Sequence, residues 1–272
     1  MTATTEHPPS TRLLLAAAVV PLAAFGLVVS VLFFVVFGPV GLVVGLVLTA
    51  VAVWVRAHTL TTGVRDRVLA RIGAGPFDRA AHARFVNLAE GLSTTSGVPV
   101  PDLFVVDDPG ANLLVVGERP DQAAMVVTTG LLAALDRIQL ESVVARGFAE
   151  LRQGQLPAAT VAVDAIARPA MTLAAGGPGA LLVRPFGGLL AAGYRSVADS
   201  DHDLVLDRSA ASLTRYPPGL VNALEQMQRV GTALLRPDPT TAHLWIADPG
   251  AAVPGMPARP MLDLRIEALR LL

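Results

Sequence analysis

The most prominent pattern in the chain is a block of apolar residues near its start. Residues 13–55 contain no charged side chain. A membrane-spanning helix needs about 20 apolar residues, so the block is long enough for two crossings. Gly38 and Pro39 divide it where a tight turn fits, because proline disfavours helix at the preceding residue. The pattern predicts a short tail over 1–12 and a transmembrane hairpin over 13–56.

The block is too long for a signal peptide, whose apolar core has only about 7 to 15 residues. The charges that flank the block predict how it is oriented in the membrane. Basic residues follow the block closely, at Arg56, Arg65, Arg67 and Arg71. By the positive-inside rule both flanks are then cytoplasmic. We expect an integral protein of a bacterial cytoplasmic membrane, in contact with the lipid bilayer and with its main domain in the cytoplasm.

The remaining residues, 57–272, alternate between helical and extended patterns. Residues 85–92 have apolar side chains at helical spacing, and Gly97 follows as a stop signal. Residues 98–130 contain three short β-branched runs separated by Asp-Asp-Pro-Gly and Glu-Arg-Pro-Asp turns. These runs predict a three-stranded antiparallel meander. The fold class is therefore α+β, a membrane hairpin followed by a mainly helical domain with a small antiparallel sheet.

Charged residues at helical spacing mark two further helices. Asp136 and Gln139 resemble a capping box, and the apolar periodicity that follows places Arg146 and Glu150 one turn apart on one helical face. A later helix begins near residue 200 and carries two carboxylates one turn apart. Helices also follow Pro217 and close the chain near its last residues.

The segment 156–194 has two interpretations. It is rich in Ala, Gly and Pro, and the uncharged stretch between Arg168 and Arg184 is too short to cross a bilayer comfortably. It forms either a re-entrant or membrane-embedded hairpin, or a segment that lies on the surface or packs against protein.

Composition excludes several chemistries. Hydrophobic residues make up 53% of the chain and charged residues only 16%, which is too apolar for an ordinary soluble domain. The net charge of −1, without a basic cluster among aromatics, argues against nucleic-acid binding. Cysteine is absent, which excludes thiolate chemistry. Lysine is absent too, so a P-loop nucleotide site is not expected.

Several strings, in this order, resemble the HtpX-like membrane zinc metalloproteases, relatives of the CAAX prenyl proteases. They are "GVPVPDLFVVDDPGANLLVVG", "AAMVVTTGLLAALDRIQLESVVA", "DLVLDRSAASLTRYPPGLVNALEQM", "AHLWIADP" and the terminal "RIEALR". The resemblance implies a membrane-anchored gluzincin-like domain, with a small sheet beside two helices that hold zinc. It also implies a role in the quality control of membrane proteins.

The resemblance breaks down at the catalytic residues. The family carries H-E-x-x-H after a string like "LESVVA", with two histidines for zinc and a glutamate that activates water. The matching positions here are Arg146, Gly147, Phe148, Ala149 and Glu150. The family's third ligand, a glutamate, falls on Asp203, and the aspartate one turn later on Asp207. We therefore expect no catalytic residue, no metal and no other cofactor, in a degenerate member of the family.

The altered positions leave open what replaces the metal. Arg146 either forms ion pairs with Asp203 and Glu150, or is solvated on an exposed face. Glycine inside a helix costs about 1 kcal/mol of helix stability relative to alanine. Gly147 therefore has one of two causes, either genetic drift or the close approach of another backbone. Asn112 matches a family asparagine beside the substrate cleft, so its strand either binds a peptide by β-augmentation or is only a sheet edge.

The expected function follows from a retained fold with a lost site. We expect a non-catalytic scaffold, adaptor or regulator whose partners are other membrane proteins or an active protease. The alternative is an active zinc endopeptidase with a metal site rebuilt around His202 and Asp203, near Asp199. A catalytic zinc normally has three protein ligands, and a histidine beside aspartates on a helix usually faces solvent. A transporter would require ionisable residues in the membrane spans, and 13–55 has none.

Overall fold

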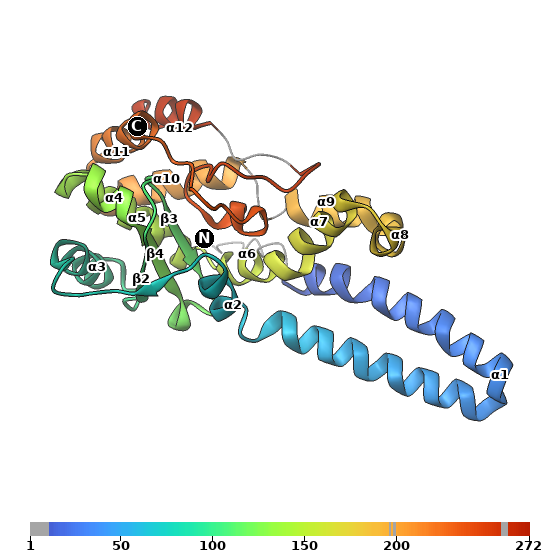
Figure 1. Ribbon diagram of the computed structural model, residues 1–272. Helices are drawn as coiled ribbons and strands as arrows, with labels where there is room; N and C mark the ends of the chain where they lie inside the picture. The colour runs from blue at the N-terminus through green and yellow to red at the C-terminus, as the bar shows by residue number, and fades with distance from the viewer. Residues whose placement is uncertain (1–10, 196, 198–199, 257–260) are drawn as a thin grey trace, which may run out of the picture.

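A long helical hairpin projects from one side of an α+β body (Figure 1). The computed structural model describes residues 11–195, 197, 200–256 and 261–272. Most of the expected N-terminal tail, residues 1–10, lies outside these ranges, as does Asp199. The α-helices are α1 (Thr11–Thr61), α2 (Val64–Arg71), α3 (Ala83–Ser96), α4 (Thr129–Ala134), α5 (Arg137–Arg152), α6 (Leu156–Ala162), α7 (Arg168–Ala175), α8 (Pro178–Val183), α9 (Gly187–Arg195), α10 (Ser200–Thr214), α11 (Pro217–Val230) and α12 (Leu262–Arg270). Short helical turns are η1 (Pro120–Gln122), the π-helical η2 (Val163–Ala167), η3 (Arg184–Phe186) and η4 (Pro239–Leu244).

The predicted turn of the hairpin lies at Gly38, inside α1. Its φ of 62° and ψ of −152° leave helical geometry, in a region that glycine enters without steric cost. The two arms approach closely, since the hydroxyls of Ser30 and Thr49 lie 3.4 Å apart and each also donates to its own helix backbone. Small residues at such contacts are typical of helix pairs in membranes. The second arm continues past the predicted end at residue 56, as far as Thr61.

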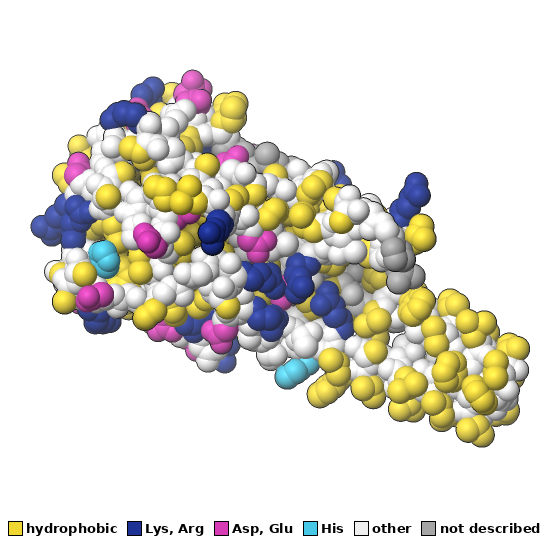
Figure 2. Space-filling view, in the orientation of Figure 1, with side chains coloured by type: hydrophobic (Ala, Val, Ile, Leu, Met, Phe, Trp, Pro, Cys, Tyr) yellow, Lys and Arg dark blue, Asp and Glu magenta, His cyan; other side chains and the backbone are white. Residues whose placement is uncertain are grey.

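The surface of the hairpin is apolar along its length (Figure 2). Exposed valine, leucine and phenylalanine side chains cover both arms, which marks a surface made for a non-aqueous environment. By length and composition, the stretch Leu14–Thr61 is apolar enough to cross a membrane. These observations agree with the predicted membrane hairpin.

The sheet differs from the predicted antiparallel meander. It has four strands in the order β1-β2-β4-β3, namely β1 (Gly75–Pro76), β2 (Asp102–Val106), β4 (Ala124–Thr128) and β3 (Leu113–Val116). β2 and β4 are parallel, whereas β4 pairs antiparallel with β3 and β2 with β1. The sheet is therefore mixed.

The connection after β2 explains this error. A two-residue turn would return the chain alongside β2, but residues 107–112 form a longer loop. Asp108 holds it, accepting from the backbone N–H of Gly110 at 2.9 Å and of Leu235 at 2.8 Å. The loop carries β3 to the far side of β4. Alternation and turn residues locate the strands, but they do not specify which strands pair.

Helix α5 lies at the centre of the body. It packs against the sheet and against α3, α10 and α11, and almost every residue from Leu140 to Leu151 is buried. The helices predicted near residues 85–92, around the two aspartates, after Pro217 and at the chain end are all present. A helix buried on all sides must satisfy any charge that it carries within the protein.

The segment 156–194 is a chain of short helices beside the start of the hairpin. It folds back at Gly176 and Gly177, which have φ values of 75° and 85°, and α6, η2 and α9 contact α1. Its first part is mostly buried, whereas α8 and much of α7 and α9 are exposed. Leu156–Ala175 is long and apolar enough to cross a membrane by length and composition. Its position relative to a bilayer stays a prediction.

Candidate functional site

The N-terminus of α5 fixes which residues of the helix face inward. The carboxylate of Asp136 accepts from the Gln139 backbone N–H at 2.9 Å, and the Gln139 side-chain oxygen accepts from the Asp136 N–H at 3.0 Å. This is the capping box predicted from the sequence. With the start of the helix fixed, Arg146 and Glu150 lie on the face that packs against α10.

The guanidinium of Arg146 binds three carboxylates. Its Nη2 donates to Oδ1 of Asp203 at 2.8 Å, its Nε to Oδ1 of Asp207 at 3.1 Å and its Nη1 to Oε2 of Glu150 at 2.8 Å. Arg146 is only 1% exposed. The expected ion pairs with Asp203 and Glu150 are thus present and extend to Asp207. The alternative, a solvated Arg146 on an exposed face, is wrong.

A second buried arginine completes this cluster from the far end of the chain. Arg265 of α12 donates to both carboxylate oxygens of Asp207, from Nε and Nη2 at 2.7 Å each, and from Nη1 to the carbonyl of Ile246 at 2.6 Å. Arg265 is not among the site residues predicted from the sequence. A signal exists in its position directly before Ile266, on the buried side of an amphipathic helix, where a charged residue requires a partner.

Burial and charge act together on the pKa values of the cluster. Burial alone would lower the pKa of Arg146, but the negative charges of Glu150, Asp203 and Asp207 outweigh it and raise the pKa. The pKa of Arg265 is raised as well, because Asp207 opposes the effect of burial. Burial would raise the pKa of Glu150, but His202 and Arg146 lower it to about 2. Both arginines and Glu150 are therefore charged at neutral pH.

Gly147 allows α5 to lie close to the sheet. A Cβ atom at this position would come 2.6 Å from Cε of Met125 and 3.4 Å from side-chain atoms of Leu113 and Val115. The contact is therefore with side chains of β3 and β4, and not with another backbone as the packing interpretation expected. Because the surroundings are apolar and buried, this position does not present a proton-accepting group to a substrate.

Comparison with known proteins places this fold and site in a family. The chain is 30% identical over 207 residues to "Protease HtpX homolog" of Dictyoglomus thermophilum, a match that covers 69% of this chain and 68% of the relative. The chain belongs to the HtpX family. The homologue of Dictyoglomus turgidum is 29% identical over 71% of each chain. That of Streptococcus pneumoniae is 26% identical over 83% of this chain and 86% of its own length. No family model and no solved structure matches the chain.

The HtpX resemblance implies zinc, and the residues present do not fit that ion. The positions expected to hold it include Arg146, which has no lone pair to donate and repels a dication. The carboxylates that face this position are bound to guanidinium groups. Within the described parts of the chain, no group of three or more His, Asp or Glu side chains is arranged to hold a metal ion.

The structure brings together only some of the residues expected to form a rebuilt metal site. Nε2 of His202 lies 3.8 Å from Oε1 of Glu150, with both side chains largely buried. Asp203 is adjacent in sequence, but its Oδ1 is bound by Arg146. Asp199 lies outside the described residues. In this HtpX-family chain, His202 thus helps to lower the pKa of Glu150 and does not face bulk solvent.

The strand that follows Asn112 is a sheet edge already covered by the chain itself. Leu114 of β3 forms an antiparallel bridge with Trp245, and the Ile246 N–H donates to the Leu113 carbonyl at 2.8 Å. The Asn112 amide donates to the Ala247 carbonyl at 2.9 Å and accepts from the Ala247 N–H at 3.2 Å. We call residues 244–248 the edge segment. It takes the place on this part of β3 that an added peptide would need.

Proposed function

We propose that this protein is a non-catalytic, membrane-anchored HtpX homologue that acts as a scaffold, adaptor or regulator in the quality control of membrane proteins. One observation carries the proposal. Arg146 binds Glu150, Asp203 and Asp207 at distances of 2.8 to 3.1 Å, so its guanidinium lies among the carboxylates where the family resemblance places zinc. A metal and this guanidinium cannot occupy the same position.

The chemistry of the neighbouring positions supports the same proposal. Hydrolysis of a peptide bond needs an activated water and a group that accepts its proton. Gly147 has no such group, and Glu150 is held ionised by Arg146 and His202 with its pKa lowered to about 2. A carboxylate with so low a pKa is a weak base, far from the near-neutral value that suits proton transfer.

We propose that partners bind at the hairpin and not at the sheet edge. The edge segment covers part of β3, which argues against the peptide capture expected beside Asn112. The hairpin instead offers an apolar surface along both arms, which fits lipid and the helices of other membrane proteins, an active protease among them. Arg56 and the basic residues of α2 favour an orientation with the body in the cytoplasm.

The alternative is an active zinc endopeptidase that uses His202, and the names of the relatives favour it, since they are called proteases. Zinc content separates the two. We would measure zinc per chain by elemental analysis of the detergent-purified protein, and cleavage of casein with and without a chelator. We expect near-zero zinc and no chelator-sensitive cleavage. About one zinc per chain, with cleavage lost on chelation, would overturn the proposal.

A reconstructed variant serves as the positive control. Arg146→His, Gly147→Glu and Glu150→His together restore H-E-x-x-H to α5, with Asp203 left in place. Because imidazole and carboxylate groups bind zinc whereas a guanidinium does not, this variant should bind more zinc than the natural chain. Zinc is compared only after circular dichroism has shown that both proteins are folded. If both then contain about one zinc per chain, the metal lies elsewhere and Arg146 does not exclude it.

A further inference from the structure

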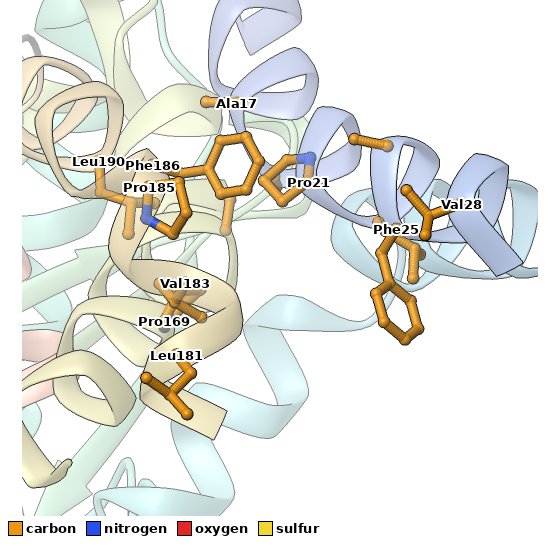
Figure 3. Close-up of a pocket in the computed structure, with 14 residues that line it drawn as sticks. Ala17, Pro21, Phe25, Val28, Pro169, Leu181, Val183, Pro185, Phe186 and Leu190 are labelled. Atoms are coloured by element: carbon orange, nitrogen blue, oxygen red, sulfur yellow. The ribbon is translucent and has the colours of Figure 1, made fainter. Parts of the chain in front are cut away.

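An apolar groove runs between the hairpin and the helices α7 to α9 (Figure 3). One wall is the first arm of α1, from Ala17 to Val28, and the other comes from Pro169, Leu181 and Phe186 with their neighbours. The groove has a volume of about 440 Å³, within the range of roughly 300 to 1,000 Å³ that small-molecule sites occupy. Every side chain that lines it is apolar, so these side chains offer no hydrogen bond to an occupant.

One wall of the groove belongs to the predicted membrane hairpin. This α1 wall spans roughly 17 Å of helix, at 1.5 Å per residue, which is about half of the ~30 Å apolar core of a membrane. The wall begins at Ala17, near the body, and reaches past the middle of an arm that runs from Thr11 to the turn at Gly38 (Figure 1). The height of the groove is therefore comparable to the thickness of one leaflet. Leu181, at 69% exposure, widens the apolar surface at its mouth.

Two exposed arginines are sequence neighbours of residues that line the groove. Arg184 is exposed and lies between Val183 and Pro185, which both line the groove. No ion pair of Arg184 occurs within the described residues. Arg168 precedes Pro169, another lining residue, and its side chain is 59% exposed.

The arginines around Arg168 carry more positive charge than the neighbouring carboxylate of Asp164 can neutralise. The carboxylate of Asp164 lies 2.7 Å from Arg71, 3.1 Å from Arg67 and 3.5 Å from Arg168, so Arg168 is the most distant of three guanidiniums that share one acid. Figure 2 shows basic side chains gathered where the hairpin joins the body. An anionic group near the groove would meet an excess of positive charge.

The charge beside the groove distinguishes between occupants. An apolar partner helix would leave the positive charge of Arg184 and Arg168 without an anion, whereas a lipid supplies both a hydrocarbon chain and a phosphate. An acyl chain is narrow and extended, and it can lie along the groove over the height of a leaflet.

We propose that the groove binds an anionic glycerophospholipid of the cytoplasmic leaflet, with an acyl chain between α1 and α7 to α9 and the phosphate at Arg184 and Arg168. The apolar lining and the height of the groove favour an acyl chain, and the two arginines favour an anionic headgroup. The site does not depend on the zinc positions, because none of its residues belongs to the cluster around Arg146.

Native mass spectrometry of the full-length protein in detergent tests this directly, with phosphatidylglycerol and phosphatidylcholine as probes. Ala24→Trp fills the groove from an exposed position that lines it, whereas Ala52→Trp adds the same ring to the exposed second arm outside the lining. We expect Ala24→Trp to abolish retained phosphatidylglycerol and Ala52→Trp to leave it unchanged. Equal retention by both variants would overturn the proposal.

The headgroup contact has its own variants. Arg184→Gln and Arg168→Gln should each weaken phosphatidylglycerol binding roughly fivefold, since an arginine near an anionic lipid contributes about 1 kcal/mol. Binding of phosphatidylcholine should change little. Arg208→Gln, exposed on α10, is the matched control. A photoreactive group placed at Ala24 should capture lipid in membranes, and capture of a protein helix in its place would overturn the proposal.

Discussion

Nη2 of Arg146 lies 2.8 Å from Oδ1 of Asp203, so a permanent cation faces the residue on which the family resemblance places the third zinc ligand. Arg146 is fixed there by two further carboxylates, and Arg265 binds one of those from the opposite side. Together two guanidiniums face three carboxylates in the interior. Such a cluster adds little to the net stability of the fold. Removal of any one member is nevertheless strongly destabilising, because the groups that remain are left buried and unpaired.

Arg146→Ala should lower the free energy of unfolding of the body by about 3 to 5 kcal/mol, because it leaves two buried carboxylates and the partly buried Glu150 with one arginine. Arg146→Met, which keeps most of the side-chain volume, should be similarly destabilising if charge rather than packing is responsible. Arg137→Ala, exposed on the same helix, should change stability by no more than about 0.5 kcal/mol. Thermal unfolding in detergent measures all three. An unchanged melting temperature for Arg146→Ala would contradict the cluster.

The stability of the body should depend on pH through Glu150. Its pKa is lowered from an ordinary value of 4.5 to about 2 in the folded state, so the folded protein binds fewer protons than the unfolded chain in this interval. The contribution of Glu150, roughly 3 kcal/mol, is then complete above pH 4.5 and is lost as the pH falls towards 2. Glu150→Gln should be less stable than the natural protein near neutral pH, and this difference in stability should narrow as the pH falls below 4.5 and close near pH 2. A gap that stays constant would show that Glu150 is not perturbed.

Gly147→Glu alone should destabilise the protein by about 2 kcal/mol or more, because it buries a carboxyl group among Met125, Leu113 and Val115. Gly147→Ala is the control. Its Cβ meets only the flexible end of Met125 closely, and alanine gains about 1 kcal/mol in helix propensity, so the two effects largely offset. Comparison of the two melting temperatures in detergent tests the assignment. Equal values would mean that the position is open to solvent or water.

Asn112→Ala should loosen the edge segment. The side chain makes two hydrogen bonds to Ala247 and one to the Thr232 carbonyl, and loss of buried bonds costs about 1 to 3 kcal/mol. Hydrogen exchange of residues 244–248 should become faster while α3 stays protected. Asn222→Ala, whose side chain is exposed on α11, should leave exchange unchanged. If the edge segment exchanges equally in both variants, Asn112 does not hold it.

The orientation of the hairpin can be read with single cysteines, since the natural chain has none. Val40→Cys lies exposed beside the turn at Gly38, and Arg208→Cys lies exposed on the body. A membrane-impermeant thiol reagent should label Val40→Cys in intact spheroplasts and Arg208→Cys only after lysis. The reverse result would place the body outside the cytoplasm. The unmodified chain provides the blank.

Local patterns predicted much of this fold. The hairpin follows from an uncharged run with Gly38 and Pro39 in its middle, and the start of α5 from Asp136 and Gln139, because each signal lies within a few residues of the structure it specifies. The pairing of Arg146 with Asp203 was also expected, but only through the family motif that brings these two helices together. Its burial could not be derived from periodicity, which does not say what covers a face.

The features that the sequence did not predict all join distant parts of the chain. Arg265 binds Asp207 across 58 residues, and Asn112 binds Ala247 across 135. The parallel pairing of β2 with β4 likewise depends on where a loop crosses the sheet. Nothing within a window of neighbouring residues specifies such contacts, since they depend on the packing of the whole body.

The bidentate contact between Arg265 and Asp207 also bears on how the protein is made. Arg265 lies 58 residues after Asp207 and 119 residues after Arg146, so it is translated well after both of them. Until it is released from the ribosome, three acidic groups of the body have Arg146 alone to neutralise them. We therefore expect the final packing of the body to wait for the translation of Arg265, long after the hairpin has been synthesised and has left the ribosome.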